Sequence, residues 1–155
     1  EKADKAAARA AADLPPQEEE RGVLAGVPPS LPALTRAWKL QARASTVGFD
    51  WNDARLVLDK IREETQEIDE ALADGDKAAI REEIGDLLFV IANLARHVDA
   101  DPEGCLAAAN TKFERRFKSI EAALEMQGRT AADASLEEME ALWQAVKKAE
   151  KAADS

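Results

Sequence analysis

Two clusters of carboxylates, each on a segment with helical periodicity, constrain this chain more than any other feature of its sequence. Residues 56–94 have the pattern of two helices joined by a tight turn at Gly75. Each helix carries acids at a place where a helix in a small bundle would turn apolar. The clusters are Glu63-Glu64-Thr65-Gln66-Glu67 and Glu82-Glu83-Ile84-Gly85-Asp86. Because residues three or four apart share a helix face, each cluster presents two carboxylates side by side.

The surroundings of four of these carboxylates differ from those of an ordinary solvated face. On the first helix Glu64 falls between Ile61 and Ile68, at the edge of the apolar stripe. On the second helix residues 87–92, which follow Asp86, are apolar almost all round, as is typical of a helix buried on several sides. Carboxylates pressed toward a core repel each other and lose hydration, which predicts a cation between them. The candidate metal ligands are Glu64, Glu67, Glu83 and Asp86.

Oxygen ligands of this kind favour a hard divalent cation, so we expect Mg²⁺, with Mn²⁺ as a possible substitute. The alternative is a solvated acidic face paired with Lys or Arg, and this interpretation suits Glu63, Glu70 and Glu82. The only histidine, His97, lies at a predicted helix end, where it would complement the helix dipole. Without a second histidine, zinc sites and Glu-x-x-His di-iron sites have little support.

Composition and length favour one all-α domain. The chain has 155 residues, 34% of them charged, with abundant Ala and no Tyr. The net charge of −10 argues against nucleic-acid binding through a basic face. No apolar run reaches the roughly 18 residues of a membrane span, and no signal peptide is visible, so we expect a cytoplasmic protein without membrane partners. The one cysteine, Cys105, excludes an internal disulfide, and we expect it in the core.

The positions of proline, glycine and helix-capping residues divide the sequence into three parts. These are a tail or linker over residues 1–29, a helical domain over 30–150 and a short tail over 151–155. We expect a bundle of about five helices with short connections. The predicted helix starts are Ser30, Asn52 or Asp53, Asp76, Asp101-Pro102 and the capping box Ser135-Leu136-Glu137-Glu138. The residues predicted to face the core include Leu72, Leu106, Phe113, Phe117, Ile120, Leu124, Leu136, Met139, Leu142, Trp143 and Val146.

The helix that follows Gly75 has more apolar surface than one chain can cover. Phe89 and Val90 point away from the stripe of Ile84, Leu88 and Ile91. We therefore expect a homodimer in which a partner subunit covers them and completes the bundle. The alternative is that the last helix of the same chain covers this patch.

A cationic segment is the second candidate for chemistry. In Asn110-Thr111-Lys112-Phe113-Glu114-Arg115-Arg116-Phe117, the two phenylalanines would hold the helix to the core. Lys112 and Arg116 then share one flank, and Asn110 lies on the other. Alone, this pattern indicates salt bridges to surface acids. Beside a carboxylate–metal centre, the same cations could bind phosphate oxygens, which would suit phosphoryl or nucleotidyl chemistry with water as nucleophile.

Several segments closely resemble the MazG family of nucleoside triphosphate pyrophosphohydrolases, and the likeness covers roughly residues 27 to 148. They are Gly48-Phe49-Asp50-Trp51, the two acidic clusters with Leu87-Leu88-Phe89, Asn93-Leu94-Ala95-Arg96-His97 and the segment 110–117. Proteins of this family often hold two such domains in tandem, and this sequence is similar to the second, catalytic one. Together with a first residue other than Met, this predicts a longer protein in which residues 1–29 form an interdomain linker.

The resemblance implies hydrolysis of a nucleoside triphosphate to the monophosphate and diphosphate, with Mg²⁺ and broad nucleotide tolerance. Glu64, Glu67, Glu83 and Asp86 would hold the metal, and Lys112 and Arg116, flanked by Asn110, would hold the triphosphate. Trp143 would lie against the base or sugar, or else be a core aromatic. Glu63 and Glu64 are the candidate catalytic residues. Glu63 would orient the attacking water or else be merely exposed. The alternatives are a house-cleaning hydrolase for one modified or deoxynucleotide, and a non-enzymatic dimeric helical module.

Overall fold

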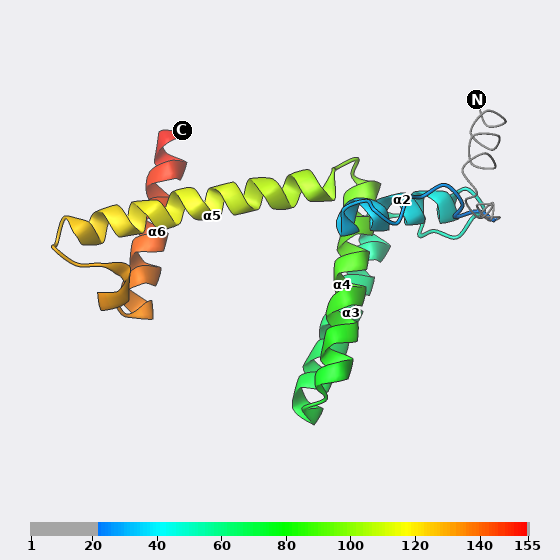
Figure 1. Ribbon diagram of the computed structural model, residues 1–155, viewed down its shortest axis with the longest axis horizontal. Coiled ribbons are helices and arrows are strands. Elements are labelled where there is room, and N and C mark those ends of the chain that lie inside the picture. The colour runs from blue at the N-terminus through cyan, green and yellow to red at the C-terminus, as the bar shows by residue number, and fades with distance from the viewer. Residues whose placement is uncertain (1–21, 155) are drawn as a thin grey trace, which may run out of the picture. The chain divides into compact units, whose positions relative to one another are not determined.

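The computed structural model describes residues 22–154, which contain five α-helices, one 3₁₀ turn and no strand (Figure 1). The all-α prediction is therefore confirmed. Residues 1–21, most of the predicted tail, lie outside the described residues. The chain divides into one compact unit that ends at Val98 and another that begins at Asp99. The assignment of residues 30–150 to a single domain stays a prediction.

The first unit consists of α2 (Ala33–Ser45), α3 (Ala54–Asp74) and α4 (Lys77–His97). Helices α3 and α4 pack side by side and antiparallel, and α2 lies across the end of α4 (Figure 1). The turn between α3 and α4 depends on Gly75, whose φ of 69° is left-handed and costs a residue with a Cβ more than it costs glycine. This antiparallel pair sets the acidic segments of α3 and α4 opposite each other.

Local capping explains where most helices begin. Asp53 accepts a hydrogen bond from Arg55 N at 2.9 Å, and Asp76 accepts one from Ala78 N at 3.0 Å, as predicted. The prediction of Ser30 as the first cap was wrong, because α2 begins only at Ala33 and Pro32 precedes it without a side-chain cap. Helical backbone angles are disfavoured for a residue that precedes proline. Leu31 therefore stays outside the helix, and α2 begins after Pro32.

The second unit consists of α5 (Pro102–Glu125), η1 (Ala131–Asp133) and α6 (Leu136–Ala153), and α6 packs across α5 (Figure 1). The predicted cap at Asp101 is confirmed by its bond from Glu103 N at 3.2 Å. The predicted capping box is also present, between Ser135 and Glu138. Ile120 and Leu124 are almost fully buried and form the centre of this unit.

Several apolar side chains predicted to be buried are exposed. Those with about half or more of their surface exposed are Leu72, Leu106, Phe113 and Leu136. Cys105 is also exposed and is not a core residue. On α4, Val90 was predicted to be left for a partner subunit to cover, and this was wrong, because Val90 is buried. The exposed apolar residues of α4 are Phe89 and the stripe of Ile84, Leu88 and Ile91. Val90 lies on the side of α4 that packs against its neighbours, so the exposed apolar face is the stripe itself.

No helix in residues 22–154 combines the length and the apolar character needed to cross a bilayer. The cytoplasmic location inferred from the sequence stays a prediction.

Candidate metal centre and cation cluster

Three of the four predicted metal ligands meet between α3 and α4. One carboxylate oxygen each from Glu64, Glu83 and Asp86 lies within 4.8 Å of the other two. Glu64 comes from α3 and is only 3% exposed, Glu83 is half-buried and Asp86 is exposed. The cluster is therefore buried at Glu64 and open to solvent at Asp86, so a cation could reach it from solvent.

The fourth predicted ligand, Glu67, interacts with the same cluster. Burial raises the pKa of Glu67 above its ordinary value, and the carboxylates of Glu64 and Glu83 raise it further. Burial disfavours the charged form, and repulsion adds to this because each additional negative charge makes the next ionisation more costly. All four acids thus share one electrostatic environment.

Lys60 is a member of this cluster that the sequence interpretation missed. Its Nζ lies 2.7 Å from Glu64 Oε1 and 3.0 Å from Glu63 Oε1. Contact with Glu64, and then with Glu63, raises the pKa of Lys60. The signal was available, since Lys60 precedes the two glutamates by three and four residues on one helix face. Glu63 itself is exposed and faces Lys60.

The chemistry of the donors fits a hard divalent cation. The three clustered ligands offer only carboxylate oxygens, and histidine and cysteine are absent from the group. Mg²⁺ and Mn²⁺ prefer oxygen ligands, whereas structural zinc sites are built from cysteine and histidine. Lys60 supplies one positive charge to several carboxylates, so the cluster keeps an excess of negative charge that a metal ion would offset.

Of the two predicted cations of the second unit, Arg116 belongs to a cluster with aromatic residues and a carboxylate. Arg116 donates from Nε and Nη2 to Glu150 Oε2 at 3.0 and 2.8 Å. Its guanidinium carbon lies 5.4 Å from the ring centroid of Trp143. Phe113 lies 5.6 Å from Trp143 and 5.9 Å from Phe117, measured between ring centroids.

Glu150 is the residue of this second cluster that sequence spacing could not reveal. Arg115 also binds it, donating from Nε and Nη2 to Oε1 at 3.1 and 2.8 Å. The two arginines together lower the pKa of Glu150. The salt-bridge interpretation therefore describes Arg116 here, whereas Lys112 and Asn110 are exposed on α5. Trp143 is half-buried, so it has both a packed and an open side.

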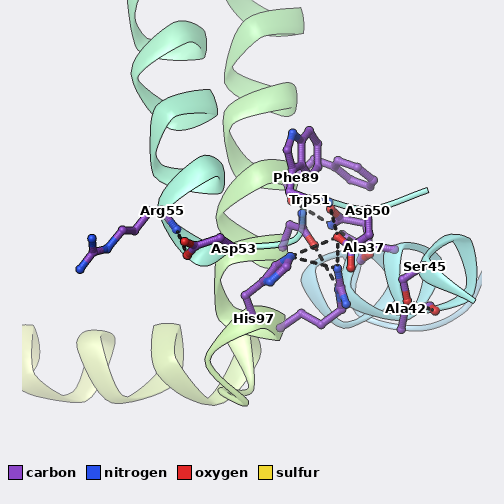
Figure 2. Close-up of polar contacts among 12 residues, drawn as sticks. Ala37, Ala42, Ser45, Asp50, Trp51, Asp53, Arg55, Phe89 and His97 are labelled. Carbon is purple, nitrogen blue, oxygen red and sulfur yellow. Dashed lines mark hydrogen bonds and ion pairs between the residues drawn. The ribbon is translucent and has the colours of Figure 1, made fainter. Parts of the chain in front are cut away.

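A third polar group joins the loop after α2 to the end of α4 (Figure 2). Asp50 Oδ1 accepts from Trp51 N at 2.8 Å and contacts Arg96 Nη2 and His97 Nε2, the latter at 3.1 Å. Burial acts to raise the pKa of Asp50, but hydrogen bonds from Arg96 and His97 hold it below its usual value. Arg96 Nε also donates to Asn93 Oδ1 at 3.0 Å. His97 is the last residue of α4, as predicted, and it also secures this loop.

Comparison with known proteins was consistent with these groups. Residues 53–120, which include all four predicted metal ligands and Lys112 and Arg116, match the MazG nucleotide pyrophosphohydrolase domain. The chain is 44% identical over 136 residues to a nucleoside triphosphate pyrophosphohydrolase of Escherichia coli strain K12, covering 86% of this chain and 52% of that protein.

Two further relatives come from other bacteria. A nucleoside triphosphate pyrophosphohydrolase/pyrophosphatase MazG of Thermotoga maritima is 42% identical over 119 residues, covering 77% of this chain and 46% of its own length. An uncharacterized protein of Bacillus subtilis, YabN, is 40% identical over 133 residues, covering 85% of this chain and 27% of its own. The chain spans about half the length of the two pyrophosphohydrolases that it matches.

Proposed function

The chain belongs to the MazG family, and we propose that it hydrolyses nucleoside triphosphates to the monophosphate and diphosphate with Mg²⁺ and with broad nucleotide tolerance. The observation that supports this most is the carboxylate cluster of Glu64, Glu83 and Asp86, with Glu67 beside it. A surface used only for solubility would not bury Glu64 to 3% exposure among other acids.

In this proposal Glu64, Glu67, Glu83 and Asp86 hold the metal. A bound Mg²⁺ would neutralise phosphate charge and lower the pKa of a water molecule. Lys60 keeps the carboxylates together by pairing with Glu64 and Glu63. Glu63 is exposed at the edge of the cluster, and we assign it the orientation of the water that attacks phosphorus.

The triphosphate is assigned to Lys112 and Arg116, flanked by Asn110. Arg116 already binds one anionic oxygen, Glu150 Oε2, through both Nε and Nη2, and the same two donors suit a phosphate oxygen. A substrate phosphate would compete with Glu150 for this guanidinium. Trp143, with Arg116 over its ring, is assigned to the base or sugar.

We assign the exposed apolar face of α4 to contact with a second copy of the chain. Its four large members are Ile84, Leu88, Phe89 and Ile91, each between 41% and 46% exposed. Solvated apolar stripes of this kind are unusual in monomers and common at interfaces. Light scattering on the native chain and on Leu88→Asp tests this, because a homodimer should dissociate with the variant.

Product analysis tests the proposed activity. The protein is incubated with ATP, GTP, CTP or UTP and Mg²⁺, and the products are separated by ion-exchange chromatography. We expect the monophosphate and diphosphate from all four, and no turnover when EDTA replaces Mg²⁺. ADP and inorganic phosphate as products would contradict the proposal. Turnover of one modified or deoxynucleotide alone would favour a house-cleaning hydrolase instead.

A further inference from the structure

The segment around α2 has a charge opposite to that of the rest of the chain. The sequence contains 31 acidic and 21 basic residues, yet residues 22–49 contain no aspartate or glutamate. Helix α2 nevertheless carries three cations, Arg36, Lys39 and Arg43. This local excess of positive charge within an acidic protein indicates an anionic partner for this region.

A cavity of about 430 Å³ lies between α2 and the turn that precedes it. The apolar part of its wall includes Val27, Leu31, Trp38 and Ala42, and its charged part is Lys39 and Arg43. Val27 is 5% exposed and fixes the turn, while Trp38 is half-buried. No residue of α3 or α4 lines this cavity, so it is separate from the carboxylate cluster. An apolar wall with a few charges and a volume in this range is typical of small-molecule sites.

The two cations at this cavity have no carboxylate partner among residues 22–154. Lys39 and Arg43 are one helical turn apart, a spacing at which like charges repel. Both are exposed, and neither forms an ion pair within residues 22–154. Arg43 lies close to the turn, since a Cβ on Gly26 would be 3.7 Å from its Nη2. Arg96, Arg116 and Arg129, by contrast, each bind a carboxylate of the protein.

We propose that this cavity is a second binding site, for an anion that carries a planar aromatic ring, and that a nucleoside monophosphate is its ligand. The ring would lie against Trp38, and the phosphate would bind Lys39 and Arg43. A cavity of about 430 Å³ is large enough for a ligand of this size. The choice of nucleotide rests on the proposed function, whose product is a nucleoside monophosphate. The binding chemistry does not depend on catalysis or on a metal.

Titration calorimetry with AMP in EDTA tests the site, because removing divalent ions separates it from the carboxylate cluster. We expect saturable binding of one AMP per chain, with weaker binding of adenosine and of inorganic phosphate. Lys39→Gln and Arg43→Gln should each weaken AMP binding about tenfold, the effect of one charge-assisted hydrogen bond. The control is Arg55→Gln, an exposed arginine on α3 outside the cavity, which should bind AMP normally. Far-ultraviolet circular dichroism confirms that each variant is folded.

A second variant examines the role of the ring. Trp38→Leu should weaken AMP binding while leaving the weak binding of inorganic phosphate unchanged. The absence of saturable binding in EDTA would overturn the proposal, and so would equal affinities for AMP and inorganic phosphate. Binding that appears only after Glu18, Glu19 and Glu20 are changed to Gln would also overturn it, because the cavity would then belong to the chain's own acidic segment. AMP binding without ATP hydrolysis would reject the proposed function alone.

Discussion

Glu67 in the first unit and Glu150 in the second have pKa values that are perturbed in opposite directions. In the first unit, burial and the neighbouring Glu64 and Glu83 raise the pKa of Glu67. In the second unit, Arg116 and Arg115 lower the pKa of Glu150, and Arg129 lowers that of Glu138 to about 2. The residue type is the same, so the difference lies in the neighbours.

This contrast separates a group of charges that is compensated within the chain from one that is not. In the second unit, Glu150 and Glu138 each bind an arginine of the same chain, so their charges are already compensated. The acids of the carboxylate cluster are held together by the packing of α3 on α4, and Lys60 bridges Glu63 and Glu64. Such uncompensated repulsion is typical of binding and catalytic sites, where stability is given up for function.

The largest expected effect comes from neutralising the buried acid. In Glu64→Gln we expect turnover of ATP to fall by about 10²–10³-fold, the usual loss when one electrostatic stabiliser is removed. We expect the melting temperature of the metal-free variant to be unchanged or higher. One repelling charge is removed, while Lys60 keeps its salt bridge to Glu63. Steady-state kinetics and thermal unfolding in EDTA measure the two effects.

A matched control for this substitution is Asp69→Asn, an exposed acid on the same helix outside the cluster. It should leave both turnover and melting temperature unchanged. A Glu64→Gln protein that is strongly destabilised in EDTA would mean that the Lys60–Glu64 pair is structural, and the contrast between the units would disappear.

The next effect is stabilisation by the metal itself. At a hundredfold excess over Kd, Mg²⁺ should stabilise the native chain by about 2.7 kcal/mol, or about 5–10 °C in melting temperature. The rise should fade as the pH falls through the pKa of Glu67, which lies above the ordinary 4.5, because a protonated ligand cannot bind the metal. Scanning calorimetry with and without Mg²⁺ measures the shift. A shift that is preserved in Glu83→Gln would place the metal elsewhere.

Local patterns predicted more of this molecule than long-range packing did. The caps Asp53, Asp76 and Asp101 were predictable because a cap depends on residues within one turn. The meeting of Glu64 with Glu83 and Asp86 was predictable because a tight turn leaves two antiparallel helices face to face.

Most of the errors and omissions involve contacts between distant segments. Exposure of Leu72 and Phe113 depends on which neighbour covers each helix, and helical periodicity does not contain that information. Glu150 lies more than 30 residues from its arginines, and Asp50 lies 47 from His97, so no spacing rule connects them. Two exceptions are local: the spacing of Lys60 to Glu64 was visible and was overlooked, and the cap predicted at Ser30 was wrong.

A smaller effect distinguishes the two arginines that share Glu150. Arg116→Gln should lower kcat/KM for ATP about tenfold or more, because a charge-assisted bond to the substrate contributes about 1.5–3 kcal/mol. Arg115→Gln is the matched control, since Arg115 binds the same carboxylate but only Arg116 lies over Trp143. Equal losses in the two variants would mean that both arginines serve only the packing of α6 on α5.

The smallest effect is a pH dependence of folding in the second unit. Because the folded pKa of Glu138 is about 2 and its ordinary value is 4.5, its pairing with Arg129 stabilises the fold above pH 4.5, and this contribution is lost as the pH falls toward 2. Glu138→Gln should remove this part of the acid-induced loss, whereas Glu140→Gln, an exposed neighbour, should not. Urea unfolding across this pH range measures the difference. Glu67 should show the opposite sign in metal-free protein, because a raised pKa makes protonation favour the folded state.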